Sequence, residues 1–78
     1  SSREASRHQG VVETSNWKDS AAIQRVFVTV RLDDGREVQA AGHFASAPRR
    51  GDIVEVSDRV SPFGGESFVV VGEAPTHG

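Results

Sequence analysis

The alternation of residues in the middle of the chain limits the fold more than any other feature. Valine or leucine occupies every second position from Val26 to Leu32, which is the pattern of a strand with one buried face. The turn-forming residues Asp33-Asp34-Gly35 follow, and a second short alternating segment comes after them. Residues 24–41 are therefore predicted to form a β-hairpin.

The register of this hairpin follows from the need to keep its apolar side chains on one face. A two-residue turn at Asp34-Gly35 would place Arg31 opposite Val38 and mix the two faces. A three-residue loop, with Gly35 in the left-handed conformation and a bulge, keeps the faces separate. We expect this second register, whose cross-strand pairs are Leu32–Arg36, Val30–Val38 and Val28–Ala40.

The composition extends the prediction of strands to the whole chain. Twelve of the 78 residues are valine and only one is leucine, and β-branched residues favour sheets over helices. A domain of this length buries only about 60% of the surface that its unfolded chain exposes, so its core is small. Further strands are predicted at residues 9–14, 52–57 and 67–71, with a turn at 61–65.

Five strands and no room for a long helix predict an all-β fold. A small closed or partly closed barrel is the natural arrangement because closure removes exposed strand edges, and the order of strands and loops fits an OB-type barrel better than an SH3-like one. Residues 10–73 are expected to form a single domain between flexible polar tails at 1–9 and 74–78. The last strand has consecutive apolar residues and is expected to be covered on both faces. The valines expected in the interior are Val26, Val28, Val30, Val38, Val54, Val56 and Val70.

Three segments of the chain resemble a known family of small barrels. Residues 10–12 (GVV), 28–36 (VTVRLDDGR) and 51–56 (GDIVEV) are similar to the first strand, the hairpin and the fourth strand of the OB fold of bacterial translation initiation factor one. The soluble OB domains of membrane-associated NfeD-like proteins are similar in the same segments. The resemblance implies an OB fold and, for the initiation-factor type, RNA binding. The chain departs from that type in its acidic net charge and its short connection at 42–51.

One candidate site is the outer face of the predicted hairpin. The expected register places Arg31 opposite Glu37, and Arg25 and Phe27 continue the same row. OB-type barrels bind single strands by stacking bases on aromatic rings while arginine contacts phosphates. The candidate nucleic-acid-binding residues are Arg25, Phe27, Arg31, Arg49 and Arg50. The structural alternative is that residues 15–23 cover Phe27 and that Glu37 neutralises Arg31.

The second candidate site consists of aromatic residues in predicted loops. Exposed aromatic side chains at loop tips are typical anchors of protein interfaces, and the candidate protein-binding residues are Trp17, Phe44 and Phe63. The alternative for Trp17 is a structural role as a plug at one end of the barrel. Nine basic residues against eleven acidic ones give a net charge of −2. This balance favours a protein partner or a larger assembly over single-stranded nucleic acid.

The sequence contains no recognisable catalytic or metal-binding motif. Cysteine is absent, which excludes disulfides and thiolate sites. The histidines are His8, His43 and His77; none has a partner at metal-ligand spacing, and only His43 lies outside the predicted tails as a base for a serine. We therefore expect a binding module without enzymatic activity, metal or cofactor. No apolar run approaches the roughly 20 residues of a membrane helix, so a cytoplasmic protein, or the soluble domain of a larger one, is expected.

Overall fold

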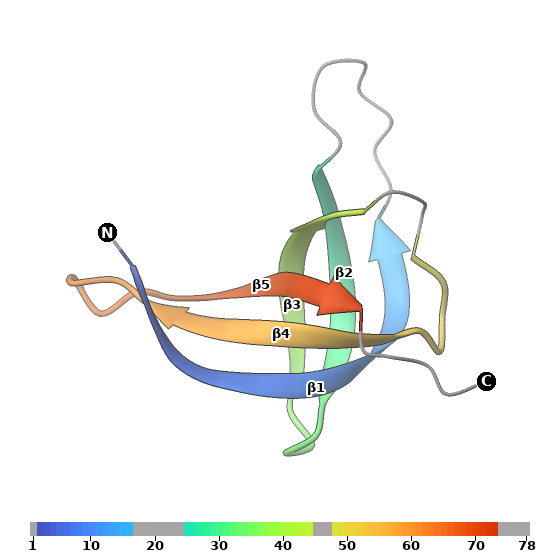
Figure 1. Ribbon diagram of the computed structural model, residues 1–78, viewed down its shortest axis with the longest axis horizontal. Coiled ribbons are helices and arrows are strands. Elements are labelled where there is room, and N and C mark those ends of the chain that lie inside the picture. The colour runs from blue at the N-terminus through green and yellow to red at the C-terminus, as the bar shows by residue number, and fades with distance from the viewer. Residues whose placement is uncertain (1, 17–24, 45–47, 74–78) are drawn as a thin grey trace.

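The computed structural model describes residues 2–16, 25–44 and 48–73, which form five strands and no helix (Figure 1). The strands are β1 (Arg3–Asn16), β2 (Arg25–Leu32), β3 (Glu37–His43), β4 (Ile53–Val60) and β5 (Glu66–Glu73). They close into one barrel in the order β1-β2-β3-β5-β4. The prediction of a small all-β barrel of five strands is confirmed. Among the described residues, none belongs to a helix that could cross a membrane.

The first strand closes the barrel because it pairs with two neighbours. Residues 10–16 of β1 pair with β2 and residues 3–11 pair with β4, so β1 bends from one neighbour to the other (Figure 1). β3 and β5 complete the circle through a short parallel contact at Ala40–Phe68 and Ala41–Val69. The other neighbouring strands are antiparallel. Each of the five strands therefore has two neighbours.

The β2–β3 hairpin has the register expected from its alternation. Val30 lies opposite Val38, and the Leu32 N–H donates to the Arg36 carbonyl over 2.7 Å. Gly35 has a φ of 92°, in the left-handed region that favours glycine. The three-residue loop is therefore confirmed, and the hairpin separates an apolar inner face from an outer face that is mostly polar.

The prediction of a flexible tail over residues 1–9 is wrong, because β1 begins at Arg3. Ser6 and His8 face inward opposite Asp58 and Val56 of β4, and their polarity removes the apolar alternation by which a strand is recognised. Pairing with β4 satisfies the backbone of this half of β1 instead. β4 and β5 also run longer than their predicted ranges of 52–57 and 67–71. The tail predicted at 74–78 lies outside the described residues.

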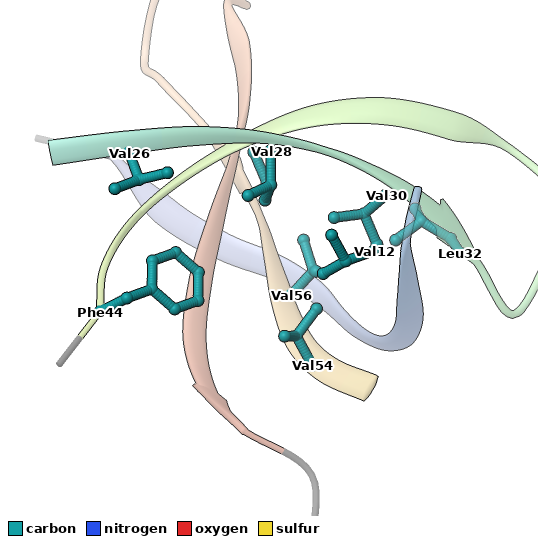
Figure 2. Packing of buried hydrophobic residues seen from close by; sticks show 9 residues of the cluster. Val12, Val26, Val28, Val30, Leu32, Phe44, Val54 and Val56 are labelled. Carbon is teal, nitrogen blue, oxygen red and sulfur yellow. The ribbon is translucent and has the colours of Figure 1, made fainter. Parts of the chain in front are cut away.

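The core lies inside the barrel and consists mainly of valine (Figure 2). Its buried residues are Val12, Val26, Val28, Val30, Leu32, Ala40, Phe44, Val54 and Val56. Val38, Phe68 and Val70 are partly buried against this cluster, so every valine expected in the interior is found there. Gly10 belongs to the same packing, since a Cβ on it would lie 2.3 Å from Cγ1 of Val30.

β5 is only partly covered, contrary to the expectation that both of its faces would be buried. Phe68 and Val70 pack towards the core, whereas Val69 is half-buried and Val71 is exposed. A single sheet layer leaves its outer face to solvent unless another segment covers it. Val11 and Ile53, which lie opposite each other on β1 and β4, are exposed as well. The barrel wall thus carries apolar side chains on its outside.

Candidate functional site

The β4–β5 turn carries the most exposed large apolar side chain of the described residues. Phe63, in this turn, is 98% exposed. Hydrogen bonds hold the turn: the Gly64 N–H donates to the Ser61 carbonyl over 3.0 Å, and the Ser61 N–H donates to the Gly65 carbonyl over 2.7 Å. Gly64 supplies the positive φ of 87° that the turn requires. Phe63 is therefore projected into solvent from a turn of defined conformation.

Phe44, the second aromatic candidate, is buried and is not an exposed anchor. It is 8% exposed and belongs to the core, and Figure 2 shows its ring beside the interior with Val26. Gly42 makes room for this ring, because a Cβ on Gly42 would lie 3.0 Å from Phe44 Cε2. A position in a predicted loop therefore did not mean exposure. Trp17, the third aromatic candidate, lies outside the described residues.

A further group of candidates lies on the outer face of β2 and β3. Phe27 is 46% exposed there and lies opposite Ala41 of β3. Ala41 in turn pairs with Val69 of β5. Phe27, Ala41 and Val69 therefore form an apolar row across three strands, here called the Phe27 row. Its aromatic ring is the kind of surface on which a base stacks.

Arg31, on the same face as Phe27, is held between two carboxylates. Its Nε lies 3.0 Å from Glu13 Oε1 and its Nη2 lies 3.3 Å from Glu37 Oε2. The pair with Glu37 agrees with the expected register. Glu13 sits at a bulge in β1, where the register with β2 shifts, and bulges redirect side chains in this way. The two carboxylates therefore neutralise much of the positive charge that Arg31 would offer to a phosphate.

The other basic candidates approach the barrel from different segments. Arg49 and Arg50 are exposed in the turn before β4, and the Gly51 N–H of that turn donates to the Val12 carbonyl of β1 over 2.8 Å. Arg25 begins β2, but its side chain is outside the described part of the structure. Of the five nucleic-acid candidates, the described side chains place only two on the outer face of β2.

A row of hydrogen-bonded polar side chains, Ser6, His8 and Asp33, lies where β1 meets the β2–β3 turn. The sequence patterns did not reveal this row, which is called the polar chain below. Ser6 Oγ is 3.0 Å from His8 Nε2, and His8 Nδ1 is 2.9 Å from Asp33 Oδ1. Ser6 and His8 are two positions apart on one strand, so they share a face, and the turn brings Asp33 to them. The Ser-x-His spacing was a usable signal only if residues 3–9 were recognised as a strand. His43, the only histidine outside the predicted tails, is exposed at the end of β3.

Two further carboxyl groups, those of Asp58 and Glu66, lie near these hydrogen-bonded side chains. Asp58 is 6% exposed, and Ser6 Oγ is 3.5 Å from its Oδ2. A hydrogen bond with Asp58, together with desolvation, raises the pKa of Glu66. Arg36 supplies positive charge, with Nη2 4.0 Å from Asp58 Oδ2 and its guanidinium carbon 5.7 Å from the centre of the Phe68 ring. The neighbourhood of Asp58 therefore disfavours the charged form of Glu66.

This polar region has the groups needed for proton transfer. An imidazole between a hydroxyl and a carboxylate can accept the hydroxyl proton while the carboxylate orients the ring. Within residues 2–16, 25–44 and 48–73, no three His, Cys, Asp or Glu side chains gather in a way that would hold a metal ion. The chemistry that these contacts support is therefore hydrogen bonding and proton movement.

Together the fold and the sites define a small all-β barrel with an aromatic turn, an apolar outer row and a polar chain at one end. No family model, curated protein or solved structure matches the chain. The resemblance to initiation factor one and to NfeD-like domains therefore stays a prediction from the sequence.

Proposed function

We propose that this barrel acts as a protein-interaction or assembly module and that Phe63 is its anchor. The observation that carries the proposal is the 98% exposure of Phe63 on a hydrogen-bonded turn. A large aromatic ring on an ordered turn loses little conformational freedom when a partner buries it, so most of the gain from burial is kept. Each strand already has two neighbours in the closed barrel, which favours a side-chain anchor over pairing at a strand edge.

The charges around the barrel support a protein partner. The net charge is −2, and Arg31 is already paired with Glu13 and Glu37. Polyanion binding relies on basic groups that release counterions from phosphates, and a paired arginine contributes less to it. The exposed side chains of Val11, Ile53 and Val71, on the outer surface of β1, β4 and β5, add apolar surface that a protein can bury.

Photo-crosslinking at position 63 tests this proposal. Benzoylphenylalanine replaces Phe63, and the chain is irradiated in an extract of its source cells. We expect one discrete product that excess wild-type chain competes away and excess Phe63→Ser chain does not. The matched control carries the same photoreactive residue at Asp34, which is exposed in the β2–β3 turn. A product that both competitors remove equally, or no product at all, would contradict the role of Phe63.

A second candidate function is single-stranded nucleic-acid binding by an OB-type barrel, and the strand order favours it. The order β1-β2-β3-β5-β4 with a parallel β3–β5 contact is the arrangement that we infer to be of OB type. Such barrels bind oligonucleotides on the β2–β3 face and on the β1–β2 and β4–β5 loops. Phe27 and Phe63 occupy two of these positions.

Titration of labelled single-stranded RNA and DNA at low and moderate salt separates the two functions. If nucleic acid is the ligand, binding appears at low salt and Phe27→Ala weakens it by about 1–3 kcal/mol, the usual contribution of one stacked base. Binding that survives Phe27→Ala and disappears with salt would indicate charge without stacking. Absence of binding at low salt would exclude this second function.

A further inference from the structure

We propose that Ser6 is a nucleophilic serine, with His8 as its base and Asp33 as the residue that orients His8. This goes beyond the interaction function, because it assigns a covalent reactivity to Ser6 of β1 and does not involve Phe63. The co-reactant it would take is a small activated acyl or phosphonyl electrophile.

The distances determine the roles of the three groups. An ionised carboxylate can only accept hydrogen bonds, so the contact of 2.9 Å between Asp33 Oδ1 and His8 Nδ1 places a proton on Nδ1. Nε2 then has a free lone pair, and it lies 3.0 Å from Ser6 Oγ. This tautomer can accept the hydroxyl proton of Ser6 at Nε2, the arrangement of an activated serine. The same hydroxyl can donate to Asp58 Oδ2 over 3.5 Å, so the shorter contact to His8 is the one along which the proton would transfer.

The backbone holds Asp33 in register with His8. The Asp33 N–H donates to the Gln9 carbonyl over 2.9 Å, and the Gln9 N–H donates back to Asp33 Oδ2 over 3.4 Å. The second carboxylate oxygen is therefore engaged with the residue next to His8 while the first orients the imidazole. The His8 side chain is 19% exposed, so surrounding atoms restrict its ring. These contacts make Asp33 a positioning residue.

A bulge and a nearby carboxylate define the surroundings of Ser6. The register between β1 and β4 shifts between Glu4 and Ser6, and bulges of this kind re-aim the side chain that follows them. Asp58 Oδ2 lies 3.5 Å from Ser6 Oγ, a longer contact than the one to His8. The Arg36 guanidinium, with Nη2 4.0 Å from Asp58 Oδ2, offsets part of the negative charge that a developing oxyanion would meet. Ser6 is half-buried, which leaves it within reach of a small molecule.

With a fluorophosphonate, Ser6 Oγ forms a bond to phosphorus while the phosphorus–fluorine bond breaks and fluoride leaves. The hydroxyl proton passes to His8 Nε2 and from there to solvent. With an activated ester, the same proton is returned to the leaving alcohol, and Ser6 carries the acyl group.

A fluorophosphonate probe tests the proposal on the full 78-residue chain. Peptide mapping by mass spectrometry should find one adduct, on Ser6. Ser6→Ala should abolish it, and Ser67→Ala, which changes an exposed serine of β5, should leave it unchanged. His8→Ala should slow labelling about 100-fold or more, which is the usual contribution of a general base.

Two further readouts separate proton transfer from a structural role. Free imidazole should restore part of the labelling of His8→Ala, and a merely structural histidine would give no such rescue. Asp33→Asn keeps an oxygen for the Gln9 N–H but removes the carboxylate, so it should slow labelling while circular dichroism shows a folded barrel. An unlabelled wild type, equal labelling of other serines, or unchanged rates in His8→Ala and Asp33→Asn would each overturn the proposal.

Discussion

Two carboxyl groups of this barrel, those of Glu66 and Glu4, make its stability depend on pH in opposite directions. Asp58 and desolvation disfavour the charged form of Glu66, so the pKa of Glu66 is raised. The Ser57 hydroxyl and the Arg7 guanidinium favour the charged form of Glu4, so the pKa of Glu4 is lowered. Because a difference in pKa between the folded and unfolded states makes stability depend on pH, the two groups have opposite effects on the unfolding free energy.

We expect Glu66→Gln to stabilise the protein at neutral pH but not at low pH. A carboxyl whose pKa is higher in the folded state costs stability once the pH rises above its unfolded value, and the cost is complete above the folded value. Glutamine removes this cost, which outweighs the lost attraction to Arg36. Melting temperatures measured between about pH 3 and pH 8 should therefore diverge from wild type as the pH rises. A difference that is independent of pH would contradict the interaction with Asp58.

Glu4→Gln is the matched variant of opposite sign. A lowered pKa contributes stability above the ordinary pKa of glutamate, and this contribution is lost as the pH falls through the folded value. Glu4 Oε1 lies 2.9 Å from Arg7 Nε in an exposed ion pair, so the effect is small and weakens with salt. The same melting series should show Glu4→Gln below wild type at neutral pH and converging with it as the pH falls through the lowered pKa of Glu4. Destabilisation at low pH alone would be inconsistent with this assignment.

Among the elements, β1 depends on a close approach to β2 at Gly10. A Cβ there would lie 2.3 Å from Cγ1 of the buried Val30 and 3.1 Å from the Arg31 carbonyl oxygen. We expect Gly10→Ala to lower the unfolding free energy by about 1–3 kcal/mol, as overpacking of a core does. Gly72→Ala on β5 is the control, since no atom lies within 4 Å of its added Cβ, and it should change stability by less than about 0.5 kcal/mol. Denaturant unfolding measures both, and equal effects would refute the close contact.

The elements also differ in how far the sequence could predict them. The β2–β3 hairpin was predictable because its determinants are local: an alternating run and a glycine at one turn position. The first half of β1 was not, since Ser6 and His8 replace apolar side chains on its inner face and its partner β4 lies far along the chain. β5 was predicted as a strand, but its coverage depends on tertiary neighbours that a single strand pattern does not contain.

The candidate sites also differ in how far the sequence could predict them. The turn around Phe63 follows from Pro62 and the glycines after Phe63, which mark a turn on their own. The burial of Phe44 depends on space left by Gly42, and the contact between His8 and Asp33 joins residues 25 positions apart. Contacts of this kind arise only when the barrel closes, so no local pattern could reveal them.

For the whole molecule, β1 links closure of the barrel to the polar chain at its end. Its residues 3–11 pair with β4 and its residues 10–16 pair with β2, so the order β1-β2-β3-β5-β4 closes only through this strand. The same pairing turns Ser6 and His8 inward, towards Asp58 and Val56. If residues 3–9 were a flexible tail instead, the barrel would be open between β1 and β4. The hydrogen bonds that link Ser6, His8 and Asp33 would then not form.

Amide hydrogen exchange followed by NMR tests this closure most directly. If β1 pairs with β4 as described, amides of residues 4–11 that face β4 exchange slowly, with protection comparable to that of the β2–β3 hairpin. Cross-strand nuclear Overhauser effects should also connect His8 with Val56 and Ser6 with Asp58. Rapid exchange throughout residues 3–9, with chemical shifts of an unstructured chain, would contradict both the closed barrel and the polar chain that it positions.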